Sequence, residues 1–163
     1  ANYQFRGNKT LYVKLDANNK MKILVMNGPN LNLLGEREPS VYGDNSLAAI
    51  NERLKDCAEK NGAQIDFFQS NHEGDIVDRI QQAYSDGTYG IVINPAAYTH
   101  TSVAILDALK AVGLPAVEIH ISDINEREAF RHISYAGLAC EEHYIGLGFE
   151  GYKKGMEYLV KRD

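Results

Sequence analysis

The chain has 163 residues, of which 44% are hydrophobic and 24% are charged, a composition typical of one soluble globular domain. Its formal net charge of −5 argues against a broad cationic surface for nucleic acid, although a small anionic substrate needs only local positive charge. No apolar run approaches the roughly 20 residues that cross a bilayer and no secretory leader opens the sequence, so we expect a cytoplasmic protein without membrane contact.

The first 20 residues differ in pattern from the rest of the chain. Tyr3–Arg6 and Leu11–Leu15 have the composition of two short strands, and Gly7, Asn8 and Lys9 between them favour a turn, a pattern compatible with a hairpin. Because a complete series of alternating strands and helices begins at Met21, we interpret residues 1–20 as an appendage added by engineering and residues 21–163 as a single domain.

From residue 21 onward, short apolar runs alternate with amphipathic stretches, as expected of repeated β-α units around a parallel sheet. The clearest helix has Ser46 as its N-cap and ends near Gly62, with an apolar face formed by Leu47, Ile50, Leu54 and Ala58. Further helices are predicted at Asp75–Ser85, Ser102–Val112, Asn125–Tyr135 and Phe149–Val160, and strands at Lys22–Asn27, Gln64–Gln69, Gly90–Asn94, Ala116–Ile121 and Tyr144–Leu147. Right-handed crossovers then favour an α/β fold of the flavodoxin-like type, a doubly wound five-stranded parallel sheet in the order 2-1-3-4-5 with helices on both faces.

Polar residues gather where the predicted strands end, which is where an open parallel sheet binds ligands. On the fourth strand, the two-residue period places Glu118, His120 and Ser122 on one side, so the carboxylate can orient and charge-balance the imidazole. The first three strands are followed by Gly28–Gly43, Gln69–Gly74 and Asn94–Ser102.

Three motifs at these strand ends resemble those of type II dehydroquinases. They are G-P-N-L-N-L-L-G-x-R-x-P-x-x-Y-G at residues 28–43, N-P-x-x-x-T-H-T-S at residues 94–102 and E-x-H-I-S at residues 118–122. The resemblance runs from Met21 nearly to the end of the chain, with slight departures at Asp123, where asparagine is expected, and at Ile133, where a basic or histidine residue is common. It implies anti elimination of water from 3-dehydroquinate to give 3-dehydroshikimate through an enolate, in the shikimate pathway of aromatic amino acid biosynthesis or in quinate catabolism. It also implies a reaction without a cofactor, and a homododecamer built as a tetramer of trimers.

The implied reaction needs a base for a carbon acid, an acid for the departing hydroxyl and donors for the enolate oxygen. We assign the base to Tyr42, whose phenolate, from an unperturbed pKa of about 10, requires a positive neighbour, and Arg37 is the candidate. Asn30 would stabilise the enolate oxygen directly or through water. His120 would protonate the leaving hydroxyl, with Glu118 holding its tautomer and orientation.

A second set of residues is assigned to substrate binding. The backbone N–H groups of Ile121 and Ser122, together with the Ser122 hydroxyl, form a candidate cradle for the substrate carboxylate. Residues 32–43 have the glycine and proline content of a lid that closes and expels water, so we predict that this segment moves when no ligand is bound. The ring hydroxyls are assigned to Asn94, His100 and Arg131, and the resemblance adds a contact from a neighbouring subunit, Asp107.

Structural roles stay open for several of these residues. Tyr42 could pack at the surface, and Asn30 could serve only to form a turn. Arg131 and Arg127, four residues apart, could form a solvated basic stripe, and Asp107 could be an exposed helix acid.

Other chemistries are less well supported by the sequence. Residues 146–151 spell G-x-G-x-x-G, but no strand follows to supply the acid that binds a ribose, so we expect no dinucleotide. We also expect no metal ion, because the spacing of the five histidines is not that of a metal site, and no Schiff base, because the strand-end motifs contain no lysine. Cys57 and Cys140 form no C-x-x-C pair, and we interpret both as reduced packing residues.

Two alternatives to the implied reaction remain. The first is a non-catalytic flavodoxin-like module such as a receiver, which needs acidic residues where Asn27–Asn30 offer none. The second is a lyase or isomerase that acts on a related hydroxylated keto acid with the same base, acid and anion cradle.

Overall fold

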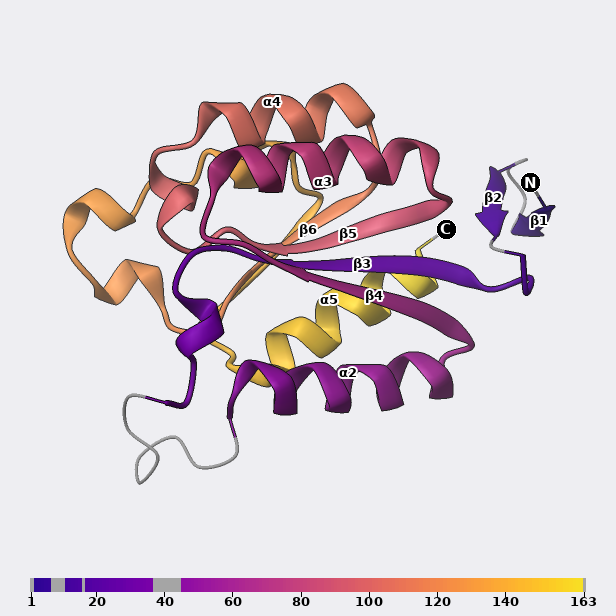
Figure 1. The fold of residues 1–163 in the computed structure, drawn as a ribbon, viewed down its shortest axis with the longest axis horizontal. Helices are drawn as coiled ribbons and strands as arrows, with labels where there is room; N and C mark the ends of the chain where they lie inside the picture. Colours follow the sequence, from indigo (N-terminus) through magenta and orange to yellow (C-terminus); the bar gives the residue numbers. More distant parts are fainter. Residues whose placement is uncertain (1, 7–10, 16, 37–44, 163) are drawn as a thin grey trace.

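A five-stranded parallel sheet forms the centre of the molecule (Figure 1). The computed structural model describes residues 2–6, 11–15, 17–36 and 45–162. The strand order is β4-β3-β5-β6-β7, which in chain order reads 2-1-3-4-5, so the predicted doubly wound α/β fold is confirmed. The strands are β3 (Met21–Asn27), β4 (Ala63–Gln69), β5 (Thr88–Asn94), β6 (Ala116–His120) and β7 (Glu142–Ile145).

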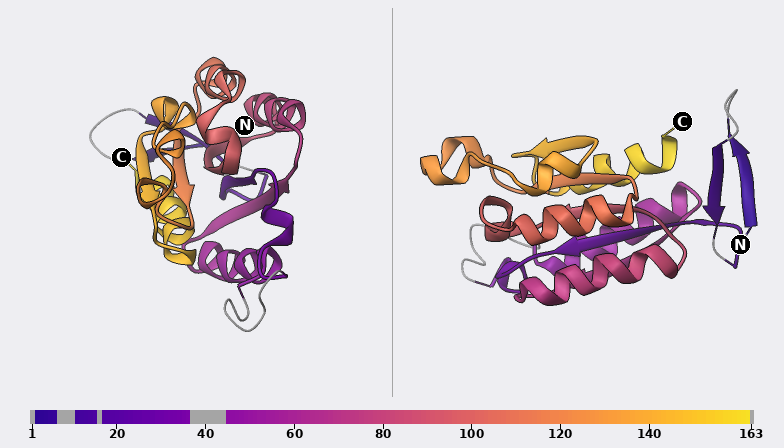
Figure 2. Two further views of the ribbon diagram at one scale, coloured as in Figure 1. Left: turned by 90° about the vertical axis from the view of Figure 1, so that its left-hand side faces the viewer. Right: turned by 90° about the horizontal axis from the view of Figure 1, so that it is seen from above.

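Helices cover both faces of this sheet, with α3 and α4 on one face and α2 and α5 on the other (Figures 1 and 2). Alternate residues of β3 serve the two layers: Ile23 and Val25 pack in the core on the α2 and α5 side, whereas Leu24 and Met26 pack on the α3 and α4 side. Both faces of the central strands are therefore buried, which explains their nearly continuous apolar sequence. The helices are α2 (Leu47–Lys60), α3 (Glu73–Ser85), α4 (Val103–Val112) and α5 (Phe149–Lys161).

Serine caps fix the starts of two of these helices. Ser46 Oγ accepts a hydrogen bond from Ala49 N at 3.1 Å, as the sequence predicted for the first helix. Ser102, which the sequence placed inside its helix, instead precedes α4 and accepts a hydrogen bond from Ile105 N at 2.9 Å.

The N-terminal strands β1 (Asn2–Arg6) and β2 (Leu11–Leu15) pair antiparallel with each other and lie at the amino end of β3, away from the carboxyl ends of the sheet (Figure 2). Leu15 is buried in the same core cluster as Met21. The assignment of residues 1–20 to an engineered addition remains an interpretation.

One predicted helix is wrong. Residues 125–135 form no α-helix but two short 3-10 turns, η3 (Ile124–Glu126) and η4 (Ala129–Arg131). Every residue from 125 to 130 is exposed, so a helix here would bury no apolar face, and burial of such a face supplies most of the stability of a helix in a protein. Arg131 Nε instead binds Glu128 Oε2 at 2.8 Å, and Asp123 Oδ1 accepts from Asn125 N at 2.9 Å.

The last strand also lies two residues earlier than predicted. It covers Glu142–Ile145 rather than Tyr144–Leu147, because Gly146 has φ of 76°, outside the extended region, and ends the pairing with β6. Three further 3-10 turns are η1 (Leu31–Leu33), η2 (Ala96–His100) and η5 (Ala136–Ala139).

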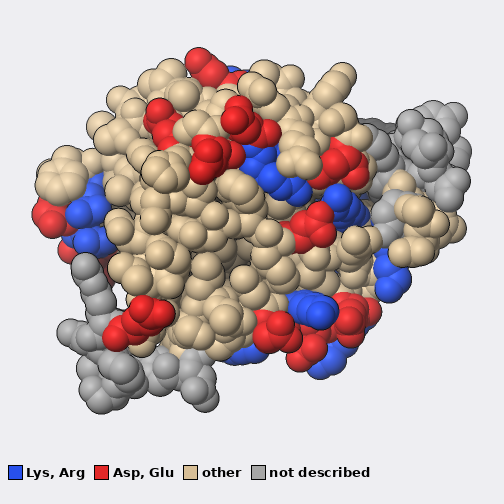
Figure 3. All heavy atoms as spheres, in the orientation of Figure 1, with Lys and Arg blue, Asp and Glu red and all other residues tan. Residues whose placement is uncertain are grey.

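The coloured surface in Figure 3 shows acidic and basic side chains intermingled on this face of the molecule. Within the described ranges, the helices are all too short or too polar to cross a membrane.

Candidate active site

The carboxyl ends of β3 and β5 lie side by side and form the floor of the site. Asn27 and Asn94 are register partners, and Gly28 N donates to Asn94 O at 2.8 Å. A Cβ on Gly28 would lie only 2.6 Å from the carbonyl carbon of Pro95. The backbone therefore passes too close to Pro95 for any residue other than glycine, and this contact brings the loop that carries Asn30 against the loop that carries His100.

Asn30 is held in an unusual backbone conformation at the edge of this floor. Its φ of 68° is in the left-handed region, which asparagine tolerates better than most residues. Its N–H donates to Asn71 Oδ1 at 2.9 Å, and Gln69 Nε2 binds the same Oδ1 at 3.2 Å and Gly28 O at 3.2 Å. These backbone contacts leave the exposed Asn30 side chain available to a ligand, as its assignment to the enolate oxygen requires.

A buried tyrosine lies beneath the same two strand ends. The Tyr152 hydroxyl of α5 donates to Asn27 Oδ1 at 2.5 Å and accepts from Asn94 Nδ2 at 3.0 Å. Burial raises the pKa of Tyr152 well above its usual range, so the hydroxyl stays protonated. Asn94 Oδ1 also accepts from Ala96 N at 3.1 Å, so the buried Asn94 amide holds the turn into η2 in addition to its predicted role toward substrate.

Glu118 and His120 form the predicted pair at the end of β6. The carboxylate is 1% exposed and the imidazole 4%, and Glu118 Oε1 lies 2.7 Å from His120 Nε2. Burial alone would raise the pKa of Glu118, but hydrogen bonds from His120, Ser134 and His143 outweigh it and lower that pKa to about 2. Because an ionised carboxylate can only accept, His120 Nε2 carries a proton and Nδ1 is left for chemistry.

Three residues that sequence reasoning missed enclose this carboxylate. The Ser134 hydroxyl donates to Oε1, and His143 Nδ1 lies 2.8 Å from Oε2. Gly137 N donates to Ser134 Oγ at 2.9 Å, and a Cβ on Gly137 would collide with Oε2. Neither the S-Y-A-G segment at residues 134–137 nor His143 carries a sequence pattern that predicts this role. For His143 the role depends on the register of β7 against β6, which pairs it with Glu118.

His100 lies beside His120. Its ring centroid is 6.5 Å from that of His120 with an interplanar angle of 20°, and its Nδ1 binds Ile133 O at 2.7 Å. A carbonyl oxygen can only accept, so Nδ1 of His100 carries a proton, and Nε2 is the acceptor nitrogen in the neutral form of the ring. Such an acceptor suits a substrate hydroxyl, which is the role that the sequence predicted for His100.

The turn after β6 is fixed by the glycines of the G-x-G-x-x-G segment. Gly146 N donates to His120 O at 3.0 Å and Gly148 N donates to Ile121 O at 3.1 Å. Both glycines have positive φ, 76° and 56°, so their place in the sequence has a structural reason independent of any nucleotide. The predicted anion cradle at Ile121 and Ser122 lies at this turn, where Ser122 is exposed.

The remaining predicted residues fall in different places. Arg131 lies on η4, which packs against η2, but its Nε binds Glu128; Arg127 is more exposed and lies 3.9 Å from the same carboxylate. Asp107 is exposed on α4. Arg37 and Tyr42, with most of the predicted lid, lie outside the described residues.

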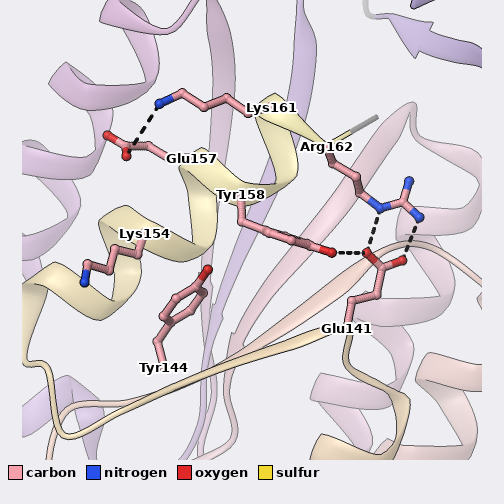
Figure 4. Close-up of a pocket in the computed structure, with 7 residues that line it drawn as sticks. All are labelled: Glu141, Tyr144, Lys154, Glu157, Tyr158, Lys161 and Arg162. Atoms are coloured by element: carbon pink, nitrogen blue, oxygen red, sulfur yellow. Dashed lines mark hydrogen bonds and ion pairs between the residues drawn. The ribbon is translucent and has the colours of Figure 1, made fainter. Parts of the chain in front are cut away.

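A wide hollow of about 770 Å³ lies elsewhere, beside β7 and the last turns of α5 (Figure 4). Two of its basic side chains already have acidic partners: Arg162 binds Glu141 through two nitrogens at 2.6 and 2.7 Å, and Lys161 lies 3.9 Å from Glu157. Glu141 directly precedes β7, at the amino end of the sheet, so this hollow is separate from the strand-end site.

A doubly wound sheet with a carboxylate-oriented histidine at its strand ends is typical of an α/β enzyme that uses acid–base chemistry. The sequence profile of the family Dehydroquinase class II matches residues 21–160, and the chain belongs to this family. The resemblance seen in the strand-end motifs is thereby confirmed.

Individual relatives agree with this membership. The chain is 51% identical over 140 residues to 3-dehydroquinate dehydratase 1 of Ralstonia nicotianae, covering 86% of this chain and 90% of that one. It is 53% identical over 139 residues to 3-dehydroquinate dehydratase of Bordetella avium, covering 85% and 96%. The crystal structure of type II dehydroquinase from Butyrivibrio crossotus superposes with a TM-score of 0.82 at 48% identity, covering 86% of this chain and 97% of the other.

Proposed function

We propose that this protein is a 3-dehydroquinate dehydratase, a hydro-lyase that converts 3-dehydroquinate to 3-dehydroshikimate. The observation that carries the proposal is the buried Glu118–His120 pair at the end of β6, in a chain about half identical to relatives that bear this name. The ionised carboxylate accepts from Nε2 and so fixes the orientation of the imidazole, whose Nδ1 can then face a departing hydroxyl and give it a proton.

The elimination divides into two proton transfers. The Tyr42 phenolate, stabilised by the guanidinium of Arg37, removes the proton alpha to the carbonyl, and the electron pair of that C–H bond forms the enolate. Asn30 donates to the enolate oxygen. When the enolate collapses, the bond from the beta carbon to its hydroxyl breaks, and His120 Nδ1 supplies the proton that lets the hydroxyl leave as water.

Binding of the substrate is assigned to groups around this acid. Ile121 and Ser122 would receive the carboxylate at the turn that follows β6, and His100, Asn94 and Arg131 would receive the ring hydroxyls. The support for His100 is its position beside His120 and its free acceptor nitrogen. Arg131 would exchange its contact with Glu128 for one with substrate.

The proposal extends to the assembly and its location. We propose a dodecamer of four trimers in which Asp107 reaches the substrate of a neighbouring subunit, supported by the exposure of Asp107 on α4. We further propose a cytoplasmic location, where the free thiols of Cys57 and Cys140 stay reduced. Light scattering coupled to size-exclusion chromatography tests the first point: a monomer in solution would contradict it.

The deciding experiment for the activity is the ultraviolet absorbance of the conjugated enone formed from 3-dehydroquinate. We expect absorbance to grow with the purified chain alone, and Tyr42→Phe to abolish the growth. Tyr158→Phe is the matched control, because the Tyr158 hydroxyl binds Glu141 at the opposite end of the sheet. No absorbance change with the unaltered protein would exclude the proposed substrate and leave the related keto acids, tested in the same way, as the alternative.

A further inference from the structure

His143 lies directly opposite Glu118 in the sheet. The two residues are register partners in the parallel pairing of β6 with β7, and neighbouring side chains on one face of a sheet are close enough to interact. His143 Nδ1 lies 2.8 Å from Glu118 Oε2, whereas His120 Nε2 lies 2.7 Å from Oε1. One carboxylate is thus shared by two imidazoles, one on each oxygen.

In the orientation that the Glu118 carboxylate adopts, both of its oxygens accept hydrogen bonds. Oε1 accepts from His120 and from the Ser134 hydroxyl, and Oε2 accepts from His143. Gly137 provides the space, because a Cβ there would collide with Oε2 and lie 3.2 Å from His143 Cε1. If His143 were removed, Oε2 would stay buried without the hydrogen bond that replaces its contact with water, which is energetically unfavourable.

The two imidazoles differ in exposure. The His143 side chain is 43% exposed and lies on the edge strand, while His120 is almost fully buried. Because Glu118 is ionised and can only accept, His143 must present a protonated Nδ1 to it, and its Nε2 is left on the exposed part of the ring. The contact that the structure gives His143 is therefore with the carboxylate, through Nδ1.

We propose that His143 is a positioning residue for the elimination: by donating to Oε2, it locks Glu118 in the rotamer that aims Oε1 at His120, and so fixes the acid. The kinetic part of this inference rests on the proposed function, but the geometric part does not.

Two substitutions separate positioning from mere packing. His143→Asn keeps an N–H donor close to the place of Nδ1, whereas His143→Leu fills a similar volume without a donor. For His143→Leu we expect kcat for 3-dehydroquinate to fall about tenfold or more, the scale seen for groups that orient a functional histidine through a hydrogen bond, with KM nearly unchanged. His143→Asn should retain most of kcat.

Crystal structures of both variants supply a readout that needs no turnover. In His143→Leu we expect the Glu118 carboxylate to rotate and its contact with His120 to lengthen, and in His143→Asn we expect both to stay in place. An unmoved Glu118 and an unchanged kcat in His143→Leu would overturn the inference. If the unaltered enzyme fails to turn over 3-dehydroquinate but Glu118 still rotates, the proposed function is refuted while the positioning role stands. Equal losses in the Leu and Asn variants would also refute positioning by the donor.

Discussion

Replacement of Glu118 by glutamine tests the Glu118–His120 pair, because it removes one negative charge and leaves the volume of the side chain almost unchanged. Three donors converge on the carboxylate, from His120, Ser134 and His143. A glutamine amide offers one accepting oxygen and one NH2 group that must face at least one of these donors. The neutral side chain therefore loses the charge and also introduces a donor–donor conflict.

The magnitude follows from the geometry of the pair. With Glu118 Oε1 2.7 Å from His120 Nε2, the centres of the two charges are about 4 Å apart. At the effective dielectric constant of about 20 that describes such sites, their attraction is about 4 kcal/mol. If that stabilisation of the imidazolium is lost, the rate falls by about 10³, since about 1.4 kcal/mol corresponds to a factor of ten.

Steady-state kinetics on 3-dehydroquinate is the assay, with Glu141→Gln as the matched control. Glu141 is also hydrogen-bonded to its neighbours, Tyr158 and Arg162, but lies at the amino end of the sheet. We expect kcat to fall by about two to three orders of magnitude in Glu118→Gln, with little change in KM, because Glu118 lies behind His120. The control should stay within twofold of the unaltered enzyme. A folded Glu118→Gln variant that keeps more than about a tenth of kcat would refute the reasoning.

Three further outcomes concern stability. Folding lowers the pKa of Glu118 from 4.5 to about 2, so its ionisation contributes about 3 kcal/mol to the free energy of unfolding above pH 4.5, and this contribution is lost as the pH falls toward 2. The free energies of unfolding of the unaltered protein and of Glu118→Gln, measured by denaturant titration, should therefore converge over that pH range. A constant difference between them would contradict this. Gly28→Ala forces a Cβ against the Pro95 carbonyl and should cost about 1–3 kcal/mol, measured as a melting temperature lower by several degrees; an unchanged melting temperature would show that the loops can separate freely. Tyr152→Phe leaves two buried asparagine amides short of a partner and should lower the free energy of unfolding by about 1–3 kcal/mol. Tyr158→Phe removes only an exposed hydrogen bond from a half-buried ring and should change that free energy by less than about 0.5 kcal/mol. Equal effects would remove the special role of the buried hydroxyl.

The sequence by itself determined the fold and the pairing of Glu118 with His120. Apolar runs of strand length, alternating with helical patterns, predict a doubly wound parallel sheet because right-handed crossovers leave few compact arrangements, and the order 2-1-3-4-5 was chosen among these. The helix capped by Ser46 follows from local rules. Glu118 and His120 could be paired from sequence alone, since residues two apart on a strand share a face. The family follows from contiguous motifs at the strand ends.

The segment after β6 could not be predicted in the same way. The spacing of its charged residues is typical of a helix, but residues 125–130 are exposed, so no neighbouring element buries one face of the segment. This lack of burial can be seen only in the packed structure. The assignments of Tyr42 and Arg37 remain predictions, because both lie outside the described residues.

Only the tertiary structure decided how the site is held together. His143 meets Glu118 through the register of an edge strand, Tyr152 reaches two strand ends from a helix more than 50 residues further along the chain, and Gly28 meets Pro95 where two loops touch. Each of these contacts joins residues that are distant in the chain. Sequence patterns reflect interactions between residues that are close in the chain, whereas these contacts depend on how whole helices, strands and loops pack. Only the packed structure therefore shows which residues surround the strand ends where Glu118 and His120 lie.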